Sequence, residues 1–198
     1  MNAQRDSASV PVSSWRSARL FVTDEFAAPP VILRVNDSVI GTLGNFSAST
    51  GKAKSKKTFN VCAIVAAAMT GGTVLNYSAS LPPERRRVLY VDTEQSRFHC
   101  KRVLCRILRL AGLPVDTHPP LLEFLCLRGY ATKGRLRKIE EAIYDLDDLG
   151  LVVIDGIRDL AHDINSPGEA TDLITKLMQW TDERRIHIHT VLHLNKGD

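Results

Sequence analysis

The chain has 198 residues, of which 44% are hydrophobic and 24% charged, and its formal net charge is +4. This length fits one ordinary domain, and the composition excludes a disordered protein. No apolar run approaches the roughly 20 residues needed to cross a bilayer, and the polar N-terminus lacks the apolar segment of a secretory signal. We therefore expect a cytoplasmic protein with no membrane partner.

Residues 1–18 are predicted to form a flexible arm, and residues 19–198 a single α/β core. The core is expected to open with a small β-hairpin, because apolar segments 31–35 and 38–43 flank the turn-forming pair Asn36-Asp37. This hairpin would precede the main sheet of the domain.

Downstream of the hairpin, apolar segments alternate with amphipathic ones. The segment Ser166-Pro167-Gly168-Glu169 is typical of a capping box at the start of a helix. We expect strands at 44–49, 88–92, 121–127, 149–155 and 186–194, and helices at 58–69, 97–110, 135–146 and 166–184. Because the strands are continuously apolar and helices separate them, the pattern predicts a mostly parallel sheet with helices on both faces.

A lysine-rich loop, "GKAKSKKT", follows the strand expected at 44–49. It matches the phosphate-loop pattern G-x-x-x-x-G-K-[ST] at Gly51, Lys57 and Thr58, but Lys56 stands where the second glycine belongs. The alternative is a solvated basic loop between two elements. The position of the loop, after a strand and before a buried helix, favours phosphate binding.

Carboxylates follow two other strands. Asp155 ends the apolar strand "LVVID", where phosphate-loop proteins place the aspartate of their Mg²⁺ site, although an aspartate in this position can also simply start a turn. Gly156 comes next rather than a glutamate, so no general base lies beside Asp155 in the sequence. Glu94, in "VLYVDTEQ", is the candidate base, unless Asp92 or Glu94 only caps the next helix.

Right-handed crossovers would bring the C-terminal ends of all these strands to one edge of the sheet. We therefore expect the lysine-rich loop, Glu94, Asp155 and His193 to lie near one another.

The motifs "GKAKSKKT", "YVDTEQS", "LVVIDG" and "VLHLNKGD" resemble, in order and spacing, those of RecA-like P-loop ATPases, particularly the hexameric replicative-helicase (DnaB-type) and plasmid RepA-type branch. The resemblance spans about residues 30–198. It implies a RecA-like fold, with the C-terminal strands of the family expected to be absent. It also implies binding of ATP with Mg²⁺.

The resemblance assigns roles to individual residues. Glu94 would activate the attacking water, Lys57 would contact the β- and γ-phosphates, and His193 would read the γ-phosphate, although a histidine in a strand can also be structural. Thr58 and Asp155 would serve the metal. Nucleotide contacts are expected from Gly51, Lys52, Ala53, Lys54, Ser55, Lys56, Lys57, Thr58, Phe59 and Asn195.

The function expected from this resemblance is Mg²⁺-dependent ATP hydrolysis coupled to single-stranded DNA, in a ring or filament with active sites at subunit interfaces. The alternative is a nucleotide-binding scaffold that hardly hydrolyses ATP. The arginine groups 85–87 and 102, 106 and 109 could contact DNA phosphates, but solvated surface is the favoured interpretation.

Overall fold

A computed structural model describes residues 14–52, 55–161 and 166–194. Its centre is a five-stranded sheet in which all neighbouring strands are parallel, in the order β3-β9-β8-β6-β7. The strands are β3 (Asn45–Lys52), β6 (Arg87–Asp92), β7 (Leu122–Cys126), β8 (Leu149–Asp155) and β9 (His187–Leu194). The predicted parallel sheet is confirmed.

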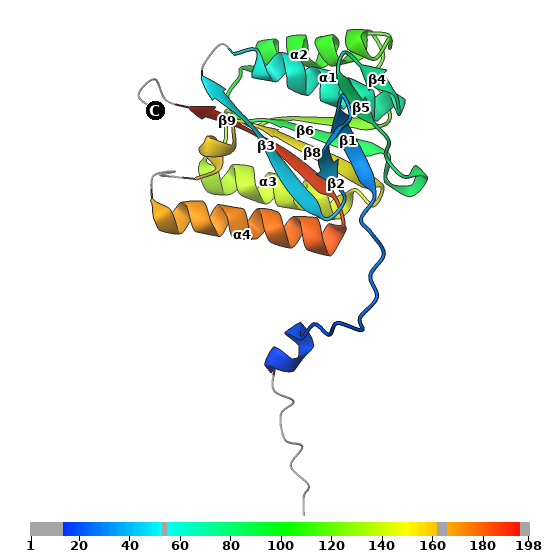
Figure 1. The fold of residues 1–198 in the computed structure, drawn as a ribbon. Coiled ribbons are helices and arrows are strands. Elements are labelled where there is room, and N and C mark those ends of the chain that lie inside the picture. Colours follow the sequence, from blue (N-terminus) through cyan, green and yellow to red (C-terminus); the bar gives the residue numbers. More distant parts are fainter. Residues whose placement is uncertain (1–13, 53–54, 162–165, 195–198) are drawn as a thin grey trace, which may run out of the picture.

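Helices cover both faces of this sheet (Figure 1). On one face lie α1 (Lys57–Thr70) and α2 (Arg97–Leu110), and on the other α3 (Thr132–Asp145) and α4 (Pro167–Arg184). Alternate residues of each central strand serve the two faces: Tyr90 and Val153 join the apolar cluster under α1 and α2, whereas Val91 and Ile154 join the cluster under α3 and α4. This explains why these strands are apolar without alternation.

A second, smaller sheet is antiparallel and has the strand order β2-β1-β5-β4. Its strands are β1 (Val31–Val35), β2 (Ser38–Thr42), β4 (Thr73–Val74) and β5 (Tyr77–Ala79). The hairpin predicted around Asn36-Asp37 is confirmed as β1 and β2. The other two strands, with two and three residues, are too short to give a periodic signal in the sequence.

Three short 3₁₀ helices complete the description: η1 (Ser14–Ala18), η2 (Pro83–Arg85) and η3 (Ile157–Leu160). Among the described residues, no helix is long and apolar enough to cross a membrane.

Two differences from the prediction concern β3 and the start of α4. β3 continues to Lys52, because it pairs with β9 along its whole length, from Asn45 with His187 to Lys52 with Leu194. Ser166 is the N-cap residue of α4 and Pro167 its first residue, as predicted, but the Ser166 side chain makes no capping hydrogen bond. The Ser166 half of the predicted capping box is therefore not formed, although the helix begins where it was expected.

Two buried histidines link β9 to the edge strand β3. His187 Nδ1 is 2.9 Å from the carbonyl oxygen of Thr42, which can only accept, so this nitrogen carries the proton. His187 Nε2 then accepts from Ser47 Oγ at 2.9 Å, Ser47 Oγ accepts from His189 Nδ1 at 2.8 Å, and His189 Nε2 accepts from Ser49 Oγ at 2.9 Å. Both imidazoles are neutral in this chain of hydrogen bonds.

Burial lowers the pKa of His187 and of His189 from 6.5 to about 4. In the unfolded chain both would take up protons below pH 6.5, whereas in the fold they do so only near pH 4. The stabilisation that this difference provides is present in full above pH 6.5. It is lost as the pH falls towards 4.

We therefore predict that the free energy of unfolding falls as the pH is lowered from 6.5 to 4, by at most about 1.4 kcal/mol per pH unit for each histidine. Urea unfolding at several pH values measures this slope. His189→Gln should reduce it, while replacing the exposed His118 with Gln should not. A slope that is the same in His189→Gln as in the wild type would contradict the assignment.

Candidate functional site

The carboxyl ends of the parallel strands meet at one edge of the sheet, and the predicted site residues that the structure describes lie there. In the register of the sheet, Asp92 is paired with Asp155, and Gly51 with His193. A cavity of about 330 Å³ lies beside these strand ends. Thr58, Glu94 and Asp155, which are distant in the sequence, all line it.

Lys57 is folded back into the loop that joins β3 to α1. Its Nζ donates hydrogen bonds to the carbonyl oxygens of Gly51 at 2.5 Å and Lys52 at 2.8 Å, and to Ser55 Oγ at 3.2 Å. Only 6% of the residue is exposed. An ammonium group held by three oxygens at the N-terminus of a helix is placed to donate to phosphate oxygens in their place.

Lys56 has the backbone conformation that glycine would adopt without strain. Its φ and ψ are 60° and 22°, in the left-handed region, at the N-cap of α1. The turn is nevertheless closed, because Phe59 and Asn60 donate their backbone N–H groups to the Lys56 carbonyl at 3.0 and 3.1 Å. A β-carbon in this region costs about 1–2 kcal/mol, so the departure from the phosphate-loop pattern is tolerated at some loss of stability.

Thr58 and Asp155 place a hydroxyl and a carboxylate next to each other, and both groups can serve as oxygen ligands of a metal. Thr58 Oγ1 donates to Asp155 Oδ2 at 3.0 Å, and the buried Tyr90 hydroxyl donates to the same oxygen at 2.9 Å. Burial, with the negative charge of Asp155 as the second cause, raises the pKa of Tyr90 well above its usual value, so Tyr90 remains a donor.

One hydroxyl and one carboxylate suit Mg²⁺, which prefers oxygen ligands and commonly completes its shell with water and substrate phosphates. Within the described part of the chain, no group of three or more His, Cys, Asp or Glu side chains forms a metal site by itself. Thr58 and Asp155 therefore fit a magnesium ion that arrives with a phosphate ligand.

Gly156 leaves room for Glu94. Its φ is +100°, and a β-carbon added there would lie 2.2 Å from Thr93 Oγ1, 2.8 Å from Glu94 Cγ and 3.2 Å from Glu94 Oε1. Glu94, which follows β6, thus fills the space that a side chain at residue 156 would need. This explains why the strand ends in Asp-Gly, since the candidate base comes from the neighbouring strand.

Asp92 shapes the turn that carries Glu94. Its Oδ1 accepts the backbone N–H groups of Glu94 at 3.1 Å and Gln95 at 2.8 Å, and its Oδ2 accepts Gln95 Nε2 at 2.8 Å. Burial raises the pKa of Asp92, and these hydrogen bonds oppose that rise. Of the two carboxylates considered for a capping role, Asp92 is the one that holds the turn.

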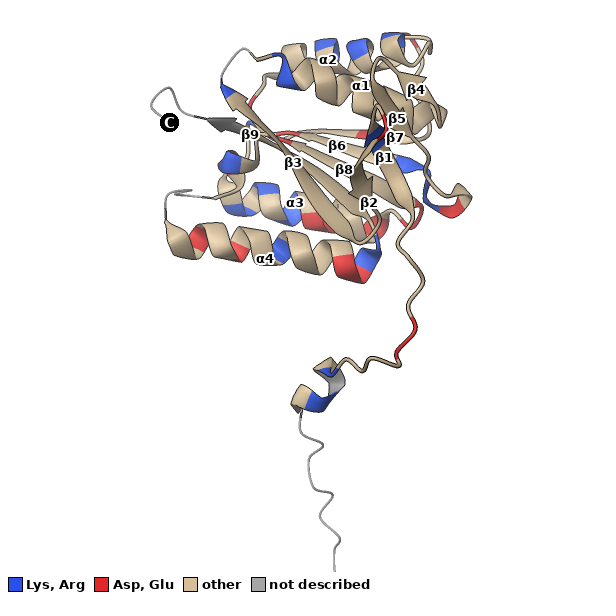
Figure 2. Ribbon diagram, in the orientation of Figure 1, with Lys and Arg blue, Asp and Glu red and all other residues tan. Residues whose placement is uncertain are grey.

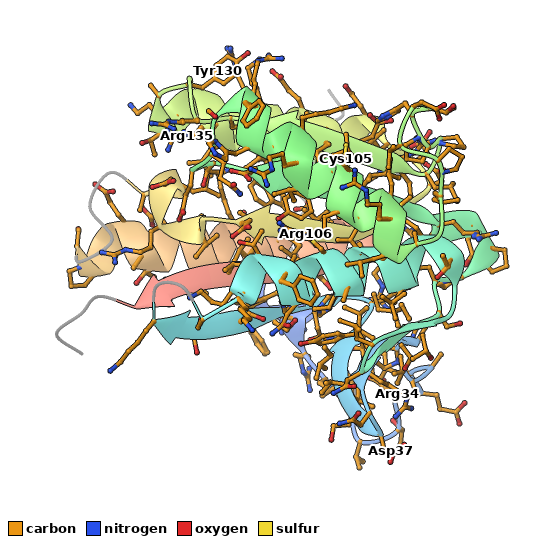
Figure 3. The ribbon with its side chains drawn as sticks, turned by 90° about the horizontal axis from the view of Figure 1, so that it is seen from above. Arg34, Asp37, Cys105, Arg106, Tyr130 and Arg135 are labelled. Carbon is orange, nitrogen blue, oxygen red and sulfur yellow. The ribbon has the colours of Figure 1, made fainter. Side chains whose placement is uncertain are left out.

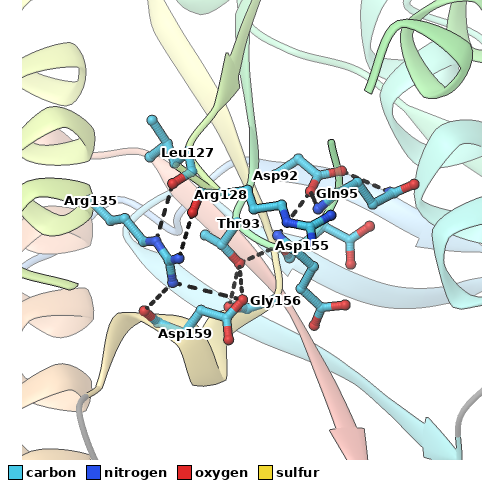
Figure 4. A network of polar contacts seen from close by, with 10 residues as sticks. Asp92, Thr93, Gln95, Leu127, Arg128, Arg135, Asp155, Gly156 and Asp159 are labelled. Carbon is cyan, nitrogen blue, oxygen red and sulfur yellow. Dashed lines mark hydrogen bonds and ion pairs between the residues drawn. The ribbon is translucent and has the colours of Figure 1, made fainter. Parts of the chain in front are cut away.

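Sequence reasoning missed a polar network behind the site (Figure 4). Thr93 Oγ1 lies 2.8 Å from the Gly156 carbonyl oxygen and 3.0 Å from Asp159 Oδ2. Arg135, on α3, donates to the carbonyl oxygens of Asp159 at 2.9 Å, Arg128 at 3.0 Å and Leu127 at 3.2 Å. The network ties the ends of β6, β7 and β8 together, and nothing in the sequence around Arg135 signals this role.

The arginines expected to be solvated have several roles. Basic residues recur along α2 (Figure 2), and two of them, Arg102 and Arg106, line the cavity together with His99. Arg87 forms ion pairs with Asp148 at 2.7 Å and Glu123 at 3.1 Å. Arg87 is therefore not a simply solvated residue, because its two ion pairs connect β6 to neighbouring segments.

Several predicted site residues cannot be placed. Ala53, Lys54 and Asn195 lie outside the described residues, and the side chain of His193 is not described. The backbone of His193 lies beside Gly51 in the β3–β9 pair. Phe59, on the first turn of α1, is 39% exposed.

Replacing Lys56 with glycine should stabilise the nucleotide-free protein by up to about 1 kcal/mol, because the strain of the left-handed β-carbon is removed. Thermal unfolding measures the gain. Lys56→Ala removes the same charge but keeps the β-carbon, so it should give no such gain. Equal stability of the two variants would show that the backbone at residue 56 is unstrained.

Gly156→Ala should destabilise the protein by about 2 kcal/mol or more, because the new methyl group collides with Thr93 and Glu94. Chemical denaturation measures the loss. Gly129→Ala is the matched control, since a β-carbon there has open space around it. If the two variants were equally stable, the packing of Glu94 against Gly156 would be refuted.

Comparison with known sequences adds one finding. The profile of the AAA domain matches residues 16–198, which is most of the chain. No curated protein matches it.

Proposed function

Since the chain belongs to the AAA domain family of P-loop ATPases, we propose that it binds ATP with Mg²⁺ and hydrolyses the bond to the terminal phosphate. We also propose that this hydrolysis is coupled to single-stranded DNA. The observation that carries the proposal is the meeting of the Lys57 loop, the Thr58–Asp155 pair and Glu94 at one sheet edge. These are the parts that phosphoryl transfer from ATP to water requires.

Binding would begin with the loop from Gly51 to Thr58. Phosphate oxygens would replace the loop oxygens that now accept from Lys57 Nζ. The backbone N–H groups of Lys57 and Thr58, at the start of α1, would donate to the same phosphate oxygens. Lys56 would add positive charge beside them. Thr58 and Asp155 would hold Mg²⁺, whose charge offsets that of the β- and γ-phosphates.

Glu94 would act as the general base. Its carboxylate would accept a proton from a water molecule while the water oxygen forms a bond to the γ-phosphorus, and the bond from that phosphorus to the bridging oxygen breaks to release ADP. Tyr90 and Thr58 position the Asp155 carboxylate during this step through their hydrogen bonds. His193 would respond to loss of the γ-phosphate, and Asn195 would add a further phosphate contact.

The coupling to DNA and the assembly into a ring or filament, with active sites between subunits, are proposed on the resemblance to DnaB-type and RepA-type ATPases. The formal net charge of +4 agrees with a polyanionic partner. A second candidate function is a nucleotide-binding scaffold with little turnover. The strained conformation of Lys56 is the observation that favours it, because that residue lies directly before Lys57.

We predict that Glu94→Gln binds Mg·ATP as the wild type does but hydrolyses it at least 100-fold more slowly, because the base is lost while the charge-neutral side chain keeps its shape. Lys57→Ala should lose both binding and turnover. Calorimetry and a phosphate-release assay, each with and without single-stranded DNA, separate the two effects. The control is Glu84→Gln, an exposed glutamate on η2.

Turnover that DNA stimulates in the wild type, and that disappears in both site variants, supports the motor function. Tight binding without turnover in the wild type supports the scaffold. The absence of any binding heat with Mg·ATP would reject both functions.

A further inference from the structure

A second cavity, of about 590 Å³, lies next to the candidate site. It opens between the turn that leads from β6 into α2 and the loop that follows β7. Its lining consists of Gln95, Ser96, Arg97, Cys126, Arg128, Gly129 and Tyr130. Gln95 also lines the first cavity, so one side chain forms a wall of both.

The lining of the second cavity is basic and carries one aromatic ring. Arg97 and Arg128 are exposed, and neither guanidinium forms an ion pair with any described residue. No aspartate or glutamate appears among the described residues that line it. Tyr130 is 41% exposed, and Lys138 Nζ lies 4.7 Å from the centroid of its ring. The cavity therefore combines uncompensated positive charge with an accessible flat ring.

The loop that presents these side chains is fixed from behind. Arg135 binds the carbonyl oxygens of Leu127 and Arg128, and the Tyr130 N–H donates to the Leu127 carbonyl at 3.0 Å. Figure 3 shows Tyr130 at the rim of the molecule with Arg135 close to it, and Figure 4 shows Arg135 holding the loop. Because the backbone is already held, a ligand would have to order only the side chains, which favours affinity.

We propose that this cavity binds one nucleotide unit of a single-stranded nucleic acid, with the phosphates on Arg97 and Arg128 and the base stacked on Tyr130. The chemistry that it recognises is a phosphate next to a nucleobase. Arginine contacts to phosphate and base stacking on an aromatic ring are the two interactions by which proteins bind single strands without reading sequence. The sequence alone shows no such pairing, because Arg97 begins α2 and Tyr130 lies in the loop after β7.

The cavity would also transmit binding to the ATP site. Gln95 is held to Asp92 through both its side chain and its backbone N–H, and Asp92 accepts the Glu94 N–H in the same turn. An occupant that contacts Gln95 would therefore act on the turn that presents the proposed base. This coupling rests on the proposed function, and it predicts that nucleic acid changes the rate of hydrolysis.

The test is binding of a labelled oligo-dT by fluorescence anisotropy at several salt concentrations. Arg97→Ala and Arg128→Ala should each weaken binding and lower the slope of log K against log salt by about 0.7. Tyr130→Leu should weaken binding about 5- to 150-fold, whereas Tyr130→Phe, which keeps the ring, should bind as the wild type does.

Matched controls come from α3. Arg137→Ala removes an exposed arginine that pairs only with Glu141 among the described residues. Tyr144→Leu removes a tyrosine that is also 41% exposed. Both controls should bind oligo-dT as the wild type does. Circular dichroism of each variant shows that it is folded.

Unchanged binding in Arg97→Ala, Arg128→Ala and Tyr130→Leu would overturn the proposal. So would competition by AMP at an affinity equal to that of the oligonucleotide, because the occupant would then be a free nucleotide rather than a strand. Basal ATP hydrolysis without DNA, measured in the same variants, should stay at the wild-type rate.

The basal rate of ATP hydrolysis distinguishes a failure of the inference about the cavity from a failure of the proposed function. If the wild type hydrolyses ATP while the three variants bind oligo-dT normally, only the inference about the cavity fails. If the wild type has no ATPase activity, the proposed function fails, and the binding data still decide what the cavity does.

Discussion

The hydrogen bond from Thr58 to Asp155 joins the first turn of α1 to the end of β8, and the other parts of the site are arranged around it. It exists because the strands are parallel, so that the loop after β3 and the end of β8 reach the same edge of the sheet. The buried hydroxyl of Tyr90, on β6, donates a hydrogen bond to the same carboxylate oxygen. Two neutral donors thus fix a charged acceptor in a region where an unsatisfied carboxylate would be costly to bury.

Two positions of the site carry residue types that differ from the usual phosphate-loop ATPase pattern: a lysine where a glycine is expected, and a glycine where a glutamate could follow the aspartate. Lys56 takes a left-handed conformation that suits glycine, whereas Gly156 keeps its neighbourhood open for the Glu94 side chain. The first arrangement costs stability and adds charge near the proposed phosphate site. The second makes room for a base that comes from β6 rather than from β8. At Lys56, local stability is lost where a charged group is placed, as is common at functional sites.

The turn between β6 and α2 connects the two cavities. Asp92 is buried, and its carboxylate holds the backbone N–H groups of Glu94 and Gln95, so these residues form one hydrogen-bonded turn. One of them faces the proposed ATP site, and the other forms a wall of the basic cavity as well. Behind the turn, Thr93 and Arg135 link it to η3 and α3. A ligand in either cavity would therefore contact the same hydrogen-bonded turn.

The sequence by itself determined the order of the strands and helices of the main sheet, their parallel arrangement and the identity of Lys57, Thr58, Glu94 and Asp155 as candidates, because these depend on local periodicity and on short motifs. Only the tertiary structure decided what lies next to what. The contact of Glu94 with Gly156, the role of Arg135 and the meeting of Arg97 with Tyr130 arise from strand register and helix packing across distant segments. No local pattern encodes such contacts, since each depends on where the whole sheet places its strand ends.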